Sequence, residues 1–351
     1  MMTGEELSGQ VKSGEVFHQE NFSEMDCRDA DLSGGIFNEV CFDNCDFTGA
    51  CLKQASFTNC SMNNAIFFGA DIKHINFVKC SLENADFKEI TTDSAKFVES
   101  NMKKTDFSLS VLVTCVFANI DLQNAVFRGL SLETIVFSGC QMQKIDMSNA
   151  DIYKTLFHGS EFKNNIFNNV SIRLSLFHGA NFDGSDFSDL DLTQCQFHES
   201  TLNGCNFTNT KLKQSGFMWG KVEGSNFDGS NLQFANFYEA DLSGSSFKNA
   251  DMTRASLQKA KIPDSDFSDA KLIQAQMEKV LADKSCFIGA DLTFADLSHA
   301  KIKNSDFSQT NLYLTNFHEV DDENTKWNGA NRALSWGTKD KRLKAEQWGK
   351  K

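Results

Sequence analysis

The sequence predicts an all-β solenoid, in which the chain winds into coils and successive coils stack as parallel strands. Two columns of residues predict it. Of the 61 positions reached by counting in fives from Phe17 to Phe317, 58 are Phe, Leu, Ile, Met or Val. Two residues before each lies a second column that is almost all small or apolar, as at Ala50, Ala55 and Ala65. One kind of inward position is therefore reused along the chain.

A strict period of five excludes the two simple secondary structures. With 3.6 residues per turn, a helix would carry a five-residue column around all of its sides. A flat strand has a period of two. The pattern fits a coil in which each pentapeptide forms one short side and turns a corner, with the large and the small residue inward and the other three outward. Each inward column then becomes a ladder of like side chains.

The repeat resembles the A-(D/N)-L-x-x consensus of the pentapeptide-repeat family. Clear copies are Ala70-Asp71-Ile72, Ala240-Asp241-Leu242, Ala250-Asp251-Met252 and Ala290-Asp291-Leu292. The resemblance covers about residues 15–321. It implies a right-handed quadrilateral parallel β-helix with twenty residues per coil.

The sequence supports a period of twenty independently. Phe fills 26 of the 31 positions 17, 27, 37 and onward, but only 4 of the 30 positions between them. The residue before the central one is Asp at 26, 46, 86 and 106, whereas the opposite series has Asp only at 296. A period of ten is thereby broken. Sixty-one pentapeptides predict about fifteen coils, with a length of roughly 70 Å at about 4.8 Å per coil.

Three segments are expected. Residues 1–14 form an N-terminal cap segment, residues 15–321 the β-helix and residues 322–351 a C-terminal cap. The last segment holds Trp327, Trp336 and Trp348, which we expect to cover the last coil, and a short helix over 339–346 with Thr338 as a possible N-cap. Its net charge of +4 leaves −17 for residues 1–321. In the resembled family, end-to-end dimers through a C-terminal helix make a homodimer possible.

Composition sets the expected compartment. No stretch approaches the roughly 18 apolar residues of a membrane span, and the N-terminus lacks the basic start and apolar run of a signal peptide. Eleven Cys without a C-x-x-C pair fit a reducing compartment. We therefore expect a cytoplasmic protein, with secretion that needs no cleavable signal left open.

One side of the predicted coil, centred on Phe47, Phe67 and Phe87, has a net charge of −9. Its candidate aspartates are Asp26, Asp46, Asp86, Asp106, Asp146, Asp186, Asp189, Asp266, Asp269 and Asp306. Fluoroquinolone-resistance and mycobacterial members of the resembled family are understood as DNA mimics that bind gyrase. About one charge per 8 Å, against one per 1.7 Å on duplex DNA, predicts weak mimicry. The alternative is that these aspartates serve the hydrogen bonds of the corners and solubility.

The opposite side is apolar where solvated residues are expected. Its candidate interface residues are Val116, Val136, Leu156, His158, Leu176, His178, Met218, Trp219 and Tyr238, and no charged outward residue lies on this side between 116 and 179. Such a strip indicates an interface with a second copy or a foreign protein. The alternatives are side chains folded over a corner, or cover by the tail.

Five of the seven His share one column on that side, at 18, 158, 178, 198 and 318. We expect exposed residues that flank the apolar strip, because neither a carboxylate nor a Cys completes a metal site. No metal, cofactor or catalytic residue is predicted, since the chain has no G-x-x-x-x-G-K-[ST], H-E-x-x-H or G-x-S-x-G motif. The acidic balance also argues against direct nucleic-acid binding.

The sequence therefore predicts a bacterial-type, non-enzymatic scaffold that docks a protein through its apolar side. One alternative is a DNA-mimic modulator of a type II topoisomerase such as gyrase. Another, implied by the resemblance, is an effector or accessory protein of a bacterial secretion system.

Overall fold

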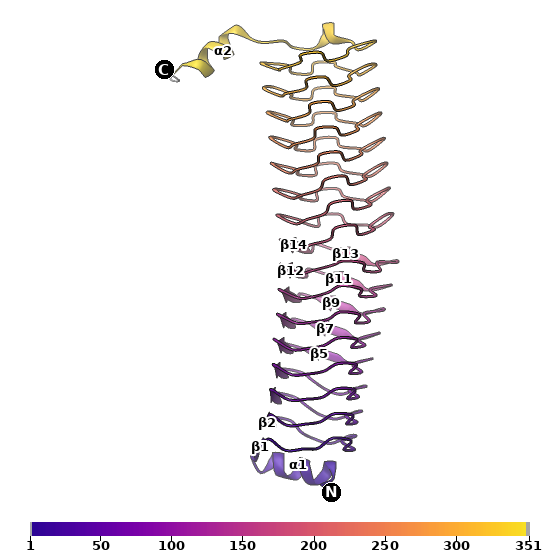
Figure 1. Cartoon of the computed structure of the whole chain (residues 1–351), viewed down its shortest axis with the longest axis vertical. Helices are drawn as coiled ribbons and strands as arrows, with labels where there is room; N and C mark the ends of the chain where they lie inside the picture. The colour runs from indigo at the N-terminus through magenta and orange to yellow at the C-terminus, as the bar shows by residue number, and fades with distance from the viewer. Residues whose placement is uncertain (1, 349–351) are drawn as a thin grey trace. The chain divides into compact units, whose positions relative to one another are not determined.

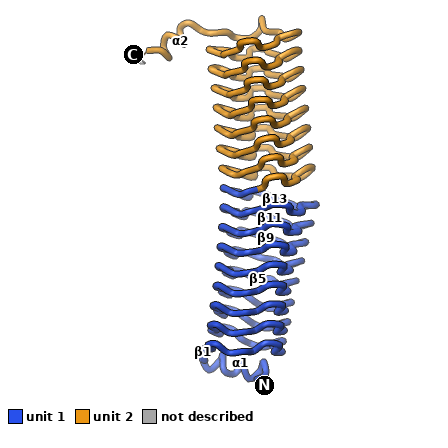
Figure 2. The backbone as a smooth tube through the Cα atoms, in the orientation of Figure 1, with its two compact units in different colours: residues 1–181 blue, residues 182–351 orange. Residues whose placement is uncertain are grey.

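The computed structural model describes residues 2–348, which fall into two compact units that meet in the sequence between Asn181 (the end of unit 1) and Phe182 (the start of unit 2) (Figure 2). Both units are parallel β-solenoids, so the all-β fold class is confirmed. The expected count of about fifteen coils assumed one uninterrupted solenoid. Because the chain divides into two units, coils are counted within each unit. In unit 1, nine strands stacked on one side mark nine successive coils.

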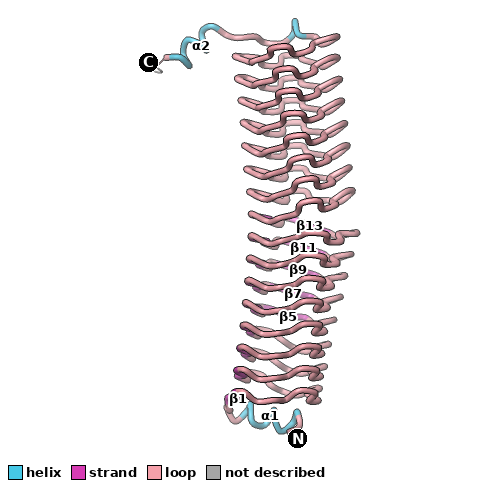
Figure 3. The backbone as a smooth tube through the Cα atoms, viewed as in Figure 1, coloured by secondary structure: helices cyan, strands magenta, loops and turns pink. Residues whose placement is uncertain are grey.

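Unit 1 contains every named strand (Figures 1 and 3). The nine-stranded parallel sheet comprises β1 (Val16–His18), β2 (Ile36–Asn38), β3 (Ser56–Thr58), β4 (Asn76–Val78), β6 (Lys96–Val98), β8 (Val116–Ala118), β10 (Val136–Ser138), β12 (Leu156–His158) and β14 (Leu176–His178). A five-stranded parallel sheet comprises β5 (Thr91–Asp93), β7 (Val111–Val113), β9 (Ser131–Glu133), β11 (Asp151–Tyr153) and β13 (Ser171–Arg173). Partners lie twenty residues apart, which confirms the predicted period.

Coils hold one another through backbone hydrogen bonds. The N–H of Phe42 donates to the carbonyl of Ser61 in the next coil at 2.7 Å, and the N–H of Cys45 donates back to Phe42 at 3.2 Å to close the corner. The residue before the small inward one adopts positive φ, as at Asn44 (60°) and Asn64 (58°). Every side can therefore be short because its polar backbone groups are satisfied by neighbouring coils.

The two inward columns are the core. Phe67 is fully buried, and its ring stacks between those of Phe47 and Phe87 at centroid distances of 5.1 and 4.6 Å. The small column is buried as well, as at Ala65 and Cys60. Because the rings stack in register, the predicted ladder of like side chains is confirmed within unit 1.

Unit 2 repeats this core with isolated bridges in place of strands. Phe187, Phe207, Phe227 and the later rings at every twentieth position stack at 4.4–5.0 Å. Trp327 continues the ladder, with its ring 4.9 Å from that of Phe307. The aromatic core of unit 2 therefore extends into the tail.

Helix α1 (Gly4–Lys12) covers the first coil of unit 1 (Figure 1). Thr3 and Glu6 form a capping box, in which each side chain accepts a hydrogen bond from the backbone of the other. Leu7 and Val11 are buried, and Lys12 pairs with Asp31 at 3.2 Å. The helix thereby shields apolar surface that the first coil would otherwise expose.

The tail of unit 2 contains the short helix η1 (Arg332–Leu334) and α2 (Asp340–Gln347). Only Trp327 matches the expected role of a cap, because Trp336 is half exposed and Trp348 is 89% exposed. The expected N-cap was wrong: Lys339 occupies that position, and Thr338 Oγ1 accepts the N–H of Glu319 instead.

Candidate functional site

The apolar strip of unit 1 lies on the outward face of the nine-stranded sheet. Val116, Val136, Leu156 and Leu176 pair in register on β8, β10, β12 and β14. Leu176 is 37% exposed and the other three are half-buried. Four apolar side chains of consecutive coils thus form one row, and we call them the apolar face.

Further apolar residues that the sequence reasoning missed border this face. Val98 lies beside Val78 and Ala118 on the same sheet, one position beyond the central Phe of each strand. Val111 is 39% exposed on β7, around the corner from Val116. Inspecting both positions that flank each central residue would have found them.

The predicted interface residues of unit 2 form a separate group. The Trp219 ring lies edge-on to that of Tyr238 at 6.2 Å, and its Nε1 donates to Glu239 at 3.2 Å. Lys259 Nζ donates to the Tyr238 hydroxyl at 2.6 Å and to Glu239 at 2.8 Å. Met218 is half-buried. This group is a polar network around two aromatic rings and lacks the uniform apolar character of the face in unit 1.

The aspartates of the acidic side have a local structural role. In Asp106, for example, Oδ1 accepts the backbone N–H of Ser108 at 2.9 Å, which forms an Asx turn at the corner. The same bond to the residue two positions on occurs at Asp26, Asp46, Asp86, Asp146, Asp186, Asp266 and Asp306. Asp189 and Asp269 occupy corner positions with φ of 60° and 56°.

Basic side chains form ion pairs with several of these aspartates. The aspartates with a Lys or Arg nitrogen within 4.0 Å are Asp26, Asp46, Asp86, Asp106, Asp146, Asp266 and Asp306. Burial acts to raise the pKa of Asp146, but hydrogen bonds from Ser148 and Arg128 outweigh it, so the pKa lies below its ordinary value. Local hydrogen bonding and ion pairing therefore give these aspartates a structural role, and the net charge of −9 on this side already includes Arg28, Lys88, Arg128 and Lys248.

The predicted His column has different environments along the chain. His158 and His178 stack with ring centroids 5.2 Å apart beside the apolar face, as expected. His18 Nδ1 lies 2.9 Å from Nδ2 of the Asn38 side chain. The expectation of exposure is wrong for His318, whose side chain is fully buried, because the tail of unit 2 lies against it.

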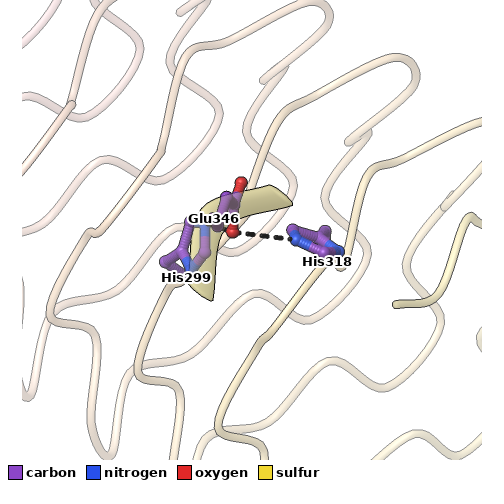
Figure 4. A group of neighbouring side chains, drawn as sticks. All are labelled: His299, His318 and Glu346. Atoms are coloured by element: carbon purple, nitrogen blue, oxygen red, sulfur yellow. Dashed lines mark hydrogen bonds and ion pairs between the residues drawn. The ribbon is translucent and has the colours of Figure 1, made fainter. Parts of the chain in front are cut away.

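His318, His299 and Glu346 form a cluster that the sequence reasoning did not find (Figure 4). Glu346 comes from α2, and its Oε2 lies 3.2 Å from Nε2 of each imidazole. Its Oε1 accepts a hydrogen bond from Arg342 Nε at 2.7 Å. That bond, with smaller contributions from His318 and His299, lowers the pKa of Glu346 to about 2. The cluster fastens α2 to the coils of unit 2.

Two imidazoles and a carboxylate are a ligand set that suits Zn²⁺, so the ring nitrogens decide what the cluster can hold. The backbone N–H of Lys339 donates to Nδ1 of His318 at 3.1 Å. A neutral His318 therefore carries its proton on Nε2 and donates it to Glu346. A His that binds a metal through Nε2 needs that nitrogen unprotonated and usually donates Nδ1–H to an acceptor, whereas Nδ1 of His318 itself accepts a hydrogen bond. The residues present fit a hydrogen-bonded latch better than a metal site.

The repeating coils with differentiated outward faces define a solenoid scaffold of the pentapeptide-repeat class. Models of that family match residues 71–147 ("Pentapeptide repeat region"), 175–214 and 290–321 ("Pentapeptide repeats (8 copies)"), and 227–271 ("Pentapeptide repeats (9 copies)"). The chain belongs to the pentapeptide-repeat family. The model of the SV2A/B/C luminal domain also matches residues 5–87. No curated protein matches the chain at a significant level.

Solved pentapeptide-repeat structures are similar at low identity. Rfr23 of the cyanobacterium Cyanothece 51142 is 18% identical, with 38% of this chain and 90% of that chain covered and a TM-score of 0.30. QnrB1, a plasmid-mediated fluoroquinolone resistance protein, is 19% identical over 59% and 97% of the two chains, with a TM-score of 0.28. HetL of Nostoc sp. strain PCC 7120 is 18% identical over 90% and 97%, with a TM-score of 0.15.

Within the described residues, no helix has the length and apolar character that crossing a bilayer requires.

Proposed function

We propose that the protein is a non-enzymatic scaffold that binds a protein partner through the apolar face of unit 1. The observation that carries this proposal is the row of Val116, Val136, Leu156 and Leu176, held in register on four consecutive strands. No inward packing requires apolar side chains there, because Phe117, Phe137 and their equivalents fill the core from the other face of each strand. Apolar side chains at outward positions are typical of an interface.

A non-enzymatic role is supported by how the reactive side chains are placed. Ser225 Oγ, for instance, donates to the carbonyl of Leu202 at 2.6 Å from the buried small column. The aspartates of the acidic side form Asx turns, as Asp106 does. These contacts give Ser and Asp structural reasons to be present that involve no reaction.

The two alternatives have less support. The ion pairs of the acidic side, such as Lys88 with Asp86 at 2.9 Å, reduce the charge that a DNA mimic would present to gyrase. An effector or accessory role in secretion would rest on the basic tail, in which α2 is held against the coils by Glu346. Neither the acidic side nor the basic tail supports its alternative function as strongly as the apolar face supports protein binding.

The test is site-specific photo-crosslinking in cells of the source organism. A photoreactive residue in place of Val136 should yield an adduct with one discrete protein, and Leu156→Asp with Leu176→Asp should abolish that adduct. The same residue in place of Asn124, an exposed corner position, is the control. Identical products from positions 136 and 124, or an adduct that survives the double substitution, would refute binding through this face.

A further inference from the structure

The strands β8, β10 and β12 of the apolar face are hydrogen-bonded to a neighbouring strand on both sides within unit 1. The strand β10 pairs with β8 on one side and with β12 on the other. The N–H of Val136 donates to Cys115 at 3.0 Å, and that of Leu156 donates to Ile135 at 2.9 Å. A partner therefore cannot add a strand to this face, and its contacts must be made by side chains.

The size of the face limits what can cover it. Four side chains about 4.8 Å apart in a strip about 10 Å wide present roughly 200 Å², to which the neighbouring valines add. A stable interface between two folded proteins buries about 800 Å² on each partner. The face is thus too small for a second copy docked by this surface alone, and it suits a single secondary-structure element.

The spacing between successive side chains of the apolar face suits a helix that runs along the stack of coils. Neighbouring side chains on one face of a helix are three or four residues apart and lie about 5–6 Å from one another. The side chains of the apolar face repeat at about 4.8 Å. From Val116 to Leu176 the row spans three such steps, about 14 Å, which corresponds to about ten residues of helix at 1.5 Å per residue.

The chain itself places a helical segment on the corresponding side of a coil in unit 2. His318 follows its central Phe317 just as His158 follows Phe157, eight periods of twenty earlier. The segment that ends in α2 lies over His318 and buries it completely. That segment is held by polar contacts, and none of the α2 side chains is buried. A helix on the uncharged apolar face of unit 1 needs an apolar stripe instead.

We propose that the occupant of the apolar face is an amphipathic α-helix of the partner protein, lying along the stack with its apolar side chains against the row. This inference rests on the proposed function and adds the form of the partner segment. Leu156 and Leu176 form one end of the row, and the imidazoles of His158 and His178 flank it. The polar side of the helix faces solvent.

The experiment uses the full-length protein and two fluorescein-labelled peptides of 18 residues with the same composition. One carries Leu at helical spacing among Gln and Ser, and the other has the Leu residues scrambled off one face. Fluorescence anisotropy should show saturable binding of the amphipathic peptide and at least tenfold weaker binding of the scrambled one. Leu156→Asp with Leu176→Asp should reduce the affinity for the amphipathic peptide at least tenfold.

A matched control adds two carboxylates elsewhere, as Asn124→Asp with Asn149→Asp at exposed corners, and should leave the affinity within twofold. Equal binding of the two peptides, no binding, or equal loss in both double variants would overturn the helix proposal. If the photo-crosslinked partner is still lost on Leu156→Asp with Leu176→Asp, the proposed function stands while the helix proposal fails. Circular dichroism of both variants checks that the solenoid is intact.

Discussion

Nε2 of the buried His318 lies 3.2 Å from Oε2 of Glu346, 28 residues further along the chain. Because Nδ1 of the same ring accepts the N–H of Lys339, both ring nitrogens of His318 bind the tail of unit 2. This one side chain thus fixes two points of the tail, one before α2 and one near its end. Three consequences of these contacts can be measured.

Loss of the Glu346 carboxylate should free α2 from the coils. In Glu346→Ala, both imidazole contacts and the Arg342 contact disappear, so the amides of residues 343–347 should exchange with deuterium about tenfold faster or more. Lys344→Ala, an exposed change on the same helix, is the control. Hydrogen-exchange mass spectrometry measures both, and unchanged exchange in Glu346→Ala would show that the latch does not hold α2.

Acid should release the same helix. The pKa of Glu346 lies at about 2, below its ordinary value of 4.5, chiefly because Arg342 hydrogen-bonds to the carboxylate. A lowered pKa stabilises the docked helix above the ordinary value, and this stabilisation is lost as the pH falls through about 2. Pepsin, which is active in this range, should cleave near Leu343 progressively faster between about pH 4 and pH 2. Glu346→Ala should already be cleaved fast at about pH 4, and equal cleavage of both proteins would contradict the assignment.

The His318 tautomer predicts that the cluster works without a metal. Chelation with EDTA should leave the exchange of α2 amides and the melting temperature unchanged, because Nε2 of His318 donates to Glu346 and is not free to bind an ion. Titration with Zn²⁺ followed by calorimetry should give no site that His318→Ala removes. A stoichiometric zinc site lost in that variant would show that the ring binds through Nε2.

Truncation of Phe67 should destabilise the protein strongly, whereas truncation of the adjacent Phe68 should have almost no effect on stability. Phe67 is fully buried and stacked between two rings, so Phe67→Ala should lower the free energy of unfolding by about 3–5 kcal/mol. Phe68 is 40% exposed on the outside of the coil, and Phe68→Ala should change the free energy of unfolding by less than about 0.5 kcal/mol. Urea denaturation followed by circular dichroism compares the two. Similar costs would mean that the ladder is not what stabilises the coil.

The inward columns could be predicted from sequence because each is specified dozens of times. The same repetition explains why the apolar face was found: Val116 and Leu176 differ from Ser56, Asn76 and Lys96, which occupy the same position in the preceding coils. Helix α1 was not predicted as a helix, although Thr3 and Glu6 have the spacing of a capping box. Its residues are weakly helical on their own, and it is stabilised by burying Leu7 and Val11 against the first coil.

The cluster at His318 could not be found in this way. His318 belongs to a column whose other members suggested an exposed residue, and its partners Lys339 and Glu346 lie outside the repeat. The position at which the tail folds back onto the coils of unit 2 occurs only once in the chain, so the repeat pattern does not specify it. The division at residues 181 and 182 was likewise not foreseen, since the five-residue register continues through it.

The twenty-residue pairing also bears on how such a chain can change during evolution. A single inserted residue would move every later side chain off its column, whereas a duplicated coil would leave each inward contact as it was. The outward residues carry no such restriction, as Val116, Val136 and Leu156 show by differing from Ser56, Asn76 and Lys96 at the same position of the preceding coils. Duplication of whole coils can therefore lengthen the solenoid during evolution, while single substitutions change its outward surface.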